Sequence, residues 1–190
     1  MKNKIGLIIG IGVIVLIGIL IGSGVSSYNS IITLSENVDN KFSDIDIQLE
    51  RRLDLIPNLV ATVKGYAAHE EKVLNQIADA RSKLAGSETT KEKAEANSEL
   101  TNAINNLLVI VENYPELKAN SNFIQLSDEL AGTENRIAVA RKDYNEVVKE
   151  YNTKISKIPH NIIASLFNFD KKEYFEAREN ANEVPKVSFE

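Results

Sequence analysis

The 190-residue chain contains no cysteine and no tryptophan, and it has only two histidines. Without cysteine there can be no disulfide scaffold, no thiolate zinc site, no cysteine nucleophile and no acylated-cysteine lipid anchor. Two histidines leave little for a histidine-based metal site. The formal net charge of −5 argues against nucleic-acid binding, because proteins that bind nucleic acid present a basic face to the phosphates. The composition excludes these classes and indicates no reaction.

Charge is also absent from a long stretch near the N-terminus, between Lys4 and Glu36. The 21 residues from Ile5 to Val25 are Ile, Leu, Val or Gly, with one serine as the exception. As a helix this run spans about 31 Å, and a bilayer's hydrocarbon core is about 30 Å thick. We therefore predict a transmembrane helix over residues 5–25, preceded by a short flank, residues 1–4. A cleaved signal peptide is the alternative, although its apolar region rarely exceeds about 15 residues.

Lysines near the span predict its orientation. Lys2 and Lys4 precede it, and only Lys41 lies within about 20 residues after it. The positive-inside rule then favours a cytoplasmic N-terminus and an extracytoplasmic body, as in a single-pass protein of the cell membrane. The two sides of the span differ by only one lysine, so a cytoplasmic body is the alternative.

Glycine is concentrated in the same span. Two GxxxG patterns occur there, and such pairs let membrane helices approach closely. The alternative is that glycine is simply common in membrane helices. We expect the lipid bilayer as one partner and homo-oligomerisation through these glycines, which are Gly6, Gly10, Gly18 and Gly22.

After the span, apolar residues recur at every third or fourth position, and no long period-two alternation indicates a strand. This pattern predicts an all-α protein in which amphipathic helices close an antiparallel four-helix bundle over residues 26–158. The expected helices are residues 28–53, 56–85, 90–113 and 122–157.

Pro57 allows two arrangements. Asp54 is a plausible N-cap and Pro is tolerated in the first turn of a helix, which favours a turn here. The apolar stripe nevertheless continues through Pro57 without a polar gap. The alternative is therefore a three-helix protein whose first helix is very long and kinked at Pro57.

Other boundaries are marked by short motifs. Thr89 and Glu92 form a capping-box pattern, and Asn122 is expected to start the last long helix. Pro159 ends that helix, so residues 159–190 form a separate C-terminal region. In it an apolar cluster is expected to cap the bundle or to touch the membrane, and the polar tail from Arg178 is expected to lack fixed structure. The cluster consists of Ile162, Ile163, Leu166, Phe167 and Phe169.

A Tyr-Asn dipeptide occurs three times, at Tyr28, Tyr144 and Tyr151. The last two copies lie seven residues apart, at the spacing of a helix core. Tyrosine at such a position usually buries its ring and reaches a hydrogen-bond partner with its hydroxyl. We predict this structural role and no ligand.

Several stretches of the sequence resemble those of a known family. The stretch from Arg51 to Glu70, RRLDLIPNLVATVKGYAAHE, resembles the signature of the LemA family. Further similar stretches cover nearly the whole chain, anchor included: 114–123, 129–145, 151–152, 167–170 and 174–176. The resemblance implies a bacterial membrane protein with one N-terminal span and a helical-bundle domain. It implies no reaction, no cofactor and no ligand residues.

His69 and Glu70 invite a test for a metal site. The helical zinc motif H-E-x-x-H requires a second histidine at position 73, which is Val73. We therefore expect no catalytic, cofactor-binding or metal-binding residue.

Charged residues beside Pro57 allow a further reading. Arg51, Arg52 and Asp54, together with His69 and Glu70, form a candidate interaction cluster for an acidic partner segment. We favour a structural role, in which the arginines bind carbonyls and carboxylates at a helix end.

The expected function is a membrane-anchored scaffold that binds one or more unidentified proteins at the cell envelope. It is not expected to be an enzyme or to bind nucleic acid. One alternative is a sensor or signal-transmitting element. The second is an envelope enzyme that uses His69 and nearby carboxylates.

Overall fold

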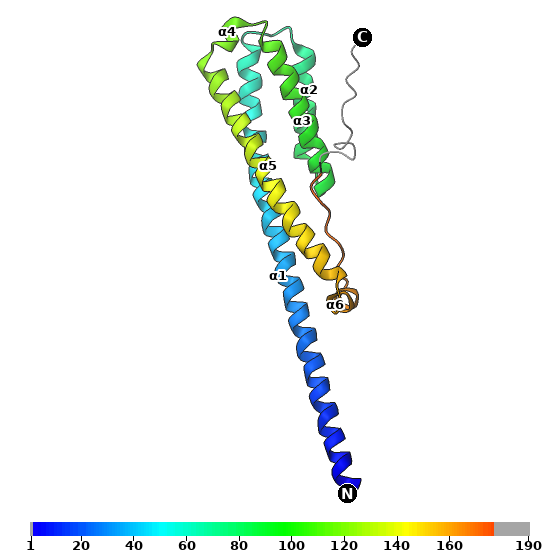
Figure 1. The fold of residues 1–190 in the computed structure, drawn as a ribbon. Helices are drawn as coiled ribbons and strands as arrows, with labels where there is room; N and C mark the ends of the chain where they lie inside the picture. The colour runs from blue at the N-terminus through cyan, green and yellow to red at the C-terminus, as the bar shows by residue number, and fades with distance from the viewer. Residues whose placement is uncertain (1, 177–190) are drawn as a thin grey trace, which may run out of the picture. The chain divides into compact units, whose positions relative to one another are not determined.

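The computed structural model describes residues 2–176, with side chains described from Gly10 onward, and within these residues it contains helices and no strand. The all-α prediction is confirmed for this part of the chain. The polar tail predicted from Arg178 lies outside the described residues. The helices are α1 (Lys2–Lys64), α2 (Glu71–Ala85), α3 (Thr90–Val111), α4 (Pro115–Lys118), α5 (Ser121–Ser156) and α6 (His160–Leu166) (Figure 1).

Helix α1 runs through Pro57 and ends at Lys64, so the predicted turn at Pro57 is wrong. A proline inside a helix costs about 3 kcal/mol. Its neighbours Ile56 and Leu59 are both fully buried, and each such burial contributes about 1.5–3 kcal/mol. Burial on both sides of Pro57 therefore outweighs the lost hydrogen bond. The very long first helix of the alternative is correct, but it stops at Lys64, and residues 65–70 separate it from α2.

The capping box at the start of α3 is confirmed. The Thr89 hydroxyl accepts a hydrogen bond from the Glu92 backbone N–H at 3.2 Å, and the Glu92 carboxylate accepts one from the Thr89 N–H at 3.1 Å. Hydrogen bonds from the backbone of Thr89 and Glu88 lower the pKa of Glu92. Helix α5 begins at Ser121, one residue earlier than expected, because the Asn120 side chain accepts a hydrogen bond from the N–H of Asn122.

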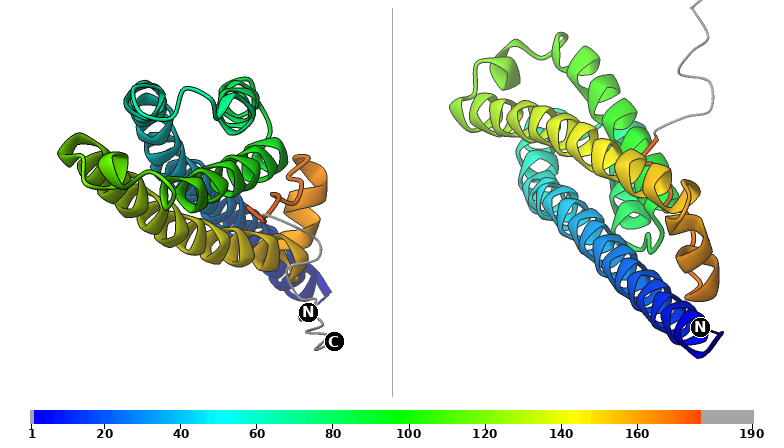
Figure 2. Two further views of the ribbon diagram at one scale, coloured as in Figure 1. Left: turned by 90° about the horizontal axis from the view of Figure 1, so that it is seen from above. Right: turned by 60° about the horizontal axis from the view of Figure 1, so that its bottom comes forward.

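The chain divides into two compact units, and α1 and α5 contribute to both. Unit 1 comprises residues 1–40 and 146–172, and unit 2 comprises residues 41–145 and 173–190. In unit 2, α2 and α3 lie side by side (Figure 2). The predicted domain boundaries and the antiparallel four-helix arrangement remain predictions.

Unit 1 has a small core in which α1, α5 and α6 each bury apolar side chains. Helix α1 contributes Ile31 and Val38, α5 contributes Tyr151 and Ile155, and α6 contributes Ala164. In the same unit, the ring of Tyr28 in α1 packs against the rings of Phe167 and Phe169, which follow α6.

The N-terminal part of α1 is the one helix among the described residues that is long and apolar enough to cross a membrane. Its most apolar window has a mean hydropathy of 2.1 and is only 6% buried, whereas a core helix of a soluble protein would be mostly buried. The chain therefore has an N-terminal helix suited to a membrane, with the span ends Ile5 and Val25 remaining predictions.

Candidate functional site

The most unusual residue of unit 2 is a buried arginine. Arg52 is only 2% exposed, although arginine is rarely buried unless it is paired. It lies seven residues after Ile45 and seven before Leu59, and both of these are core residues. The spacing of seven places Arg52 on the core side of α1, and its neighbour Leu53 is only half-buried.

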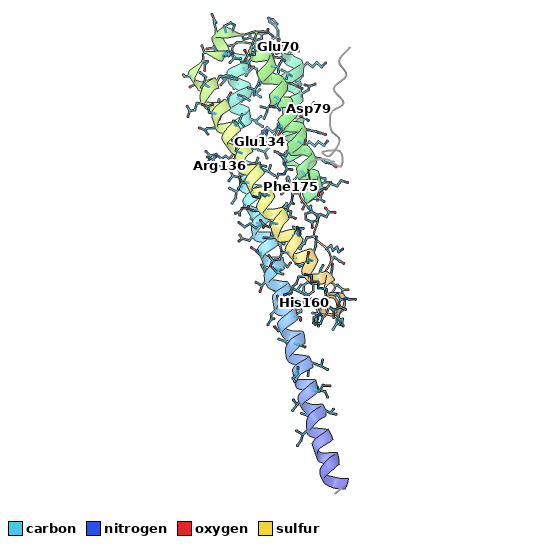
Figure 3. The ribbon with its side chains drawn as sticks, in the orientation of Figure 1. Glu70, Asp79, Glu134, Arg136, His160 and Phe175 are labelled. Atoms are coloured by element: carbon cyan, nitrogen blue, oxygen red, sulfur yellow. The ribbon has the colours of Figure 1, made fainter. Side chains whose placement is uncertain are left out.

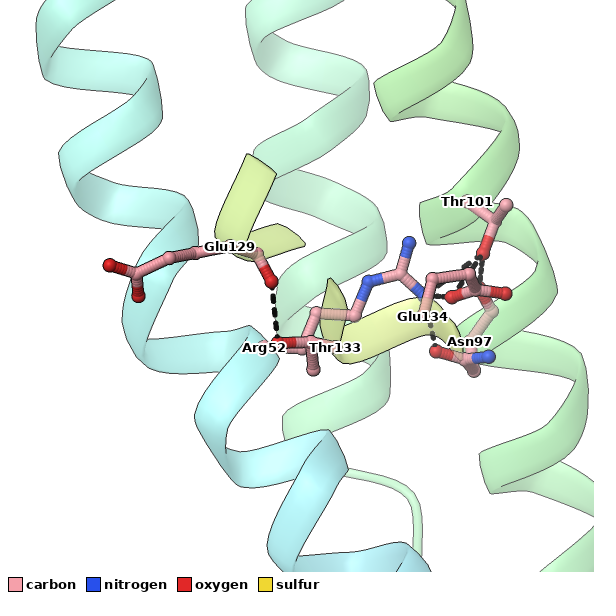
Figure 4. A network of polar contacts seen from close by, with 6 residues as sticks. All are labelled: Arg52, Asn97, Thr101, Glu129, Thr133 and Glu134. Carbon is pink, nitrogen blue, oxygen red and sulfur yellow. Dashed lines mark hydrogen bonds and ion pairs between the residues drawn. The ribbon is translucent and has the colours of Figure 1, made fainter. Parts of the chain in front are cut away.

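Two other helices, α3 and α5, supply partners for this guanidinium (Figure 4). Arg52 Nη1 lies 2.6 Å from Asn97 Oδ1 and 2.9 Å from Thr101 Oγ1, both on α3. The same nitrogen lies 2.6 Å from Glu134 Oε2 on α5. Thr133 is fully buried beside Glu134, and its hydroxyl donates to the Glu129 carbonyl of the same helix. The network joins α1, α3 and α5 through one side chain.

The electrostatics of this network are those of a compensated ion pair. Burial lowers the pKa of Arg52, and the Glu134 carboxylate acts in the opposite direction by favouring the charged form. Because a guanidinium is not deprotonated in proteins, Arg52 stays charged and cannot serve as a base. The arrangement can hold three helices in register, and it offers no group for acid–base chemistry.

A groove lies on the other side of α5, between that helix and α1. Its volume is about 500 Å³, and Ile124 in its wall is 47% exposed. Arg51 approaches Glu129 across it at 3.8 Å, and Arg136 projects at the outer edge of α5 (Figure 3). We call it the α1–α5 groove; its lining residues are Arg51, Ser121, Ile124, Gln125, Asp128, Glu129, Gly132 and Arg136.

The predicted interaction cluster is distributed over different surroundings. Arg51 lines the groove, Arg52 is in the core, and Asp54 is exposed on α1. Asp54 precedes the end of α1 by ten residues, or about 15 Å of helix, and His69 and Glu70 follow that end. The structure therefore does not gather the five residues into one site, and their role in interaction remains a prediction.

His69 is exposed in the connection between α1 and α2. Beside it, Glu70 accepts a hydrogen bond from the Tyr114 hydroxyl at 2.7 Å. That bond raises the pKa of Tyr114. Within residues 10–176, no group of three His, Asp or Glu side chains is placed to hold a metal ion. Glu70 thus ties the connection to the start of α4.

The described glycines of the two GxxxG patterns face open space. A Cβ atom built on Gly10, Gly18 or Gly22 would meet nothing within 4 Å. The surroundings of Gly6 are not described, because side chains are described only from Gly10 onward. These positions are free to meet another helix, and their role in self-association remains a prediction.

The two Tyr-Asn pairs of α5 each hold the irregular segment that follows α6. In unit 2, Asn145 forms two hydrogen bonds with the backbone of Phe175, at 2.8 and 3.3 Å. The Tyr144 hydroxyl donates to the carbonyl of Glu173 at 2.9 Å. Phe175 itself is fully buried. The Asn145 side chain thus bonds both the N–H and the carbonyl of Phe175, which are the two hydrogen bonds that a neighbouring β-strand would otherwise supply.

The same device recurs one heptad later, within unit 1. Asn152 accepts from the Lys172 N–H and donates to its carbonyl, both at 2.9 Å. The Tyr151 hydroxyl donates to the Asp170 carbonyl at 3.0 Å. The hydroxyl role predicted for these tyrosines is confirmed, but sequence reasoning missed the asparagines. The signal was present in the repeat of the whole dipeptide at a spacing of seven.

Comparison with known proteins gives a family and several relatives. The model of the LemA family matches residues 41–189. Magnetosome protein MamQ 2 of Paramagnetospirillum magneticum is 28% identical over 177 residues, which cover 80% of this chain and 65% of that protein. Magnetosome protein MamQ of Magnetospirillum gryphiswaldense is 25% identical over 200 residues, 92% of this chain and 73% of its own length. Protein LemA of Metamycoplasma hominis is 27% identical over 167 residues, with 87% and 76% covered. This chain thus spans less than two thirds of MamQ 2.

Proposed function

The chain belongs to the LemA family, and on that premise we propose that it is a single-pass membrane protein whose helical part is a docking scaffold for a partner protein at the cell envelope. Helix α1 supports the anchor, because its N-terminal part is apolar and exposed. The N-terminus is cytoplasmic and the helical units lie outside the cytoplasm, as the lysine distribution favours.

The α1–α5 groove is the observation that carries the scaffold role. It is about 500 Å³ in volume, it is open to solvent, and it combines apolar Ile124 with charges of both signs. An amphipathic helix of a partner fits such a groove, with its apolar side on Ile124 and an acidic residue near Arg136. The Arg52 network supports this role by holding the helices that form the walls.

Filling the groove is expected to abolish partner binding and to leave the fold intact. A Cβ atom on Gly132 would meet only the end of Arg136, at 4.0 Å, so Gly132→Leu places its side chain in the groove without a clash with backbone. A photo-crosslinker at Gln125 in cells should form a discrete adduct that Gly132→Leu removes. The matched control Ala138→Leu, exposed on the same helix outside the groove, should keep the adduct. Adducts that survive Gly132→Leu would contradict the proposal.

Topology is tested with the same full-length chain, which contains no cysteine. A cysteine at exposed Glu88 is expected to react with a membrane-impermeant maleimide in intact cells. A cysteine at Leu16, within the span, should stay unreactive before and after lysis. Reaction at position 88 only after lysis would reverse the orientation and direct the search to cytoplasmic partners.

A further inference from the structure

Helix α6 and the turn before it leave an unusually large apolar surface open. Ile158 is 81% exposed, Ile162 63% and Leu166 70%. Ile162 and Leu166 are four residues apart in α6 and so lie on one side of that helix, and Ile158 lies in the turn that leads into it. Soluble proteins rarely leave contiguous apolar surface of this kind without a partner. We call these three residues the α6 apolar face.

The opposite side of α6 is fixed against α1 within unit 1. Ile163 Cδ1 would lie 3.8 Å from a Cβ atom on Gly24, so the two helices approach closely there. The rings of Tyr28 and Phe167 have centroids 4.7 Å apart, and Phe169 adds a second ring at 5.7 Å from Tyr28. The contacts explain why α6 has a definite position and why its other apolar side remains open.

That position is the end of the apolar run of α1. Gly24 is the penultimate residue of the predicted span, and Tyr28 lies three residues beyond Val25, which is about 4.5 Å along the helix. The polar layer on each side of the hydrocarbon core is about 5–7 Å thick. The first charged residue of α1 after the span is Glu36, two to three turns further on. With the predicted span in the hydrocarbon core, α6 lies at the depth of the lipid headgroups.

Charges around the α6 apolar face suit a headgroup layer. Lys157 and Lys171 are exposed and Lys154 is half-buried, and the exposed acidic residues nearest to them in the chain are Glu150, Asp170 and Glu173. Long lysine side chains can extend to lipid phosphates while their stems remain in apolar surroundings. At the start of α6, burial and the nearby Lys154 lower the pKa of His160.

We propose that α6 is a second membrane contact, in which Ile158, Ile162 and Leu166 insert into the bilayer surface where α1 leaves it. The α6 apolar face is covered by lipid. The Tyr28 ring of α1 packs against Phe167 at the end of α6, and this contact holds the α6 face beside the span. This proposal rests on the membrane span of the proposed function.

Site-directed spin labelling of the whole chain tests this contact. Single cysteines at Ile162 and Leu166 carry a nitroxide, in vesicles of phosphatidylcholine and phosphatidylglycerol at 3:1 (about that ratio of neutral to anionic lipid suits an anionic membrane surface). Thr153, exposed on α5 in the same unit, is the matched control, and Leu16 is the reference within the span. We expect severalfold greater access of oxygen relative to a water-soluble nickel complex at positions 162 and 166 than at 153.

The outcomes separate the two proposals. Labels at 162 and 166 that resemble 153, with a lipid-exposed label at Leu16, would overturn the α6 contact and leave the span intact. A water-exposed label at Leu16 would overturn the span itself. Dipolar broadening between labels at 162 and 166 that disappears when labelled chains are diluted with unlabelled ones would assign the face to a second copy of the chain and overturn the lipid contact. Each replaced residue is exposed, so unchanged far-ultraviolet circular dichroism is expected for every labelled chain.

Discussion

Arg52→Met is expected to lower the free energy of unfolding of the full chain by about 2–3 kcal/mol. Breaking a buried ion pair by removing one partner typically costs about 3–5 kcal/mol. Here the cost is smaller because the Glu134 side chain is 36% exposed and can regain water. The remaining penalty comes mainly from Asn97, which is buried and loses the donor to its side-chain oxygen. Urea unfolding in detergent micelles, followed by circular dichroism at 222 nm, measures it.

The neighbouring arginine provides the matched control. Arg51 carries the same charge one residue earlier, but its side chain is 52% exposed and lies 3.8 Å from Glu129. Arg51→Met is expected to change stability by less than about 0.5 kcal/mol, as surface pairs usually do. The double variant Arg52→Met/Asn97→Leu should recover part of the loss, because it removes the unsatisfied amide. Equal losses for Arg51→Met and Arg52→Met would show that the network has no special structural role.

Asn152→Ala is expected to release the segment around Lys172 and to accelerate its cleavage by trypsin about 30-fold. The substitution removes two backbone hydrogen bonds, each contributing about 1 kcal/mol, and about 2 kcal/mol corresponds to a factor of about 30 in local opening. Cleavage after Lys171 and Lys172, followed by mass spectrometry under conditions where reclosing outpaces cleavage, measures this opening.

Asn135→Ala serves as the control for that experiment. Asn135 is an exposed asparagine on the same helix, so its loss should leave the cleavage rate unchanged. Asn145→Ala, which removes the equivalent pair of bonds to Phe175, should expose the chain around Glu173 in the same way. A cleavage rate for Asn152→Ala equal to that of Asn135→Ala would contradict the clamping role of these asparagines.

Local signals in the chain predicted several features correctly. The Thr89–Glu92 box depends on two residues three positions apart, so no distant contact is needed to form it. The all-α class followed from the three-four apolar spacing, and the membrane-suited helix followed from length and hydropathy. The family resemblance, stated on the stretch from Arg51 to Glu70, agrees with the family match over residues 41–189.

The errors lie where a local preference competed with burial. Pro57 has a local preference for a turn or a first helical position, but the burial of Ile56 and Leu59 keeps α1 continuous through it. Arg52 was assigned by its charge to a helix end, although its spacing from Ile45 places it in the core. A buried arginine is tolerated only if acceptors from other helices reach it, and these acceptors are distant in the chain.

By itself, then, the sequence determined the helical class, the membrane-suited apolar run and the α3 cap, because each depends on residues within a few turns of one another. Only the tertiary structure decided that Arg52 meets Asn97 and Glu134, that Asn152 holds Lys172, and that α6 lies against the end of the apolar run. These contacts join residues 20 or more positions apart in the chain, the Arg52 partners being 45 and 82 residues away. Their formation depends on how whole helices pack, and helix periodicity specifies which side is apolar but not which neighbour covers it.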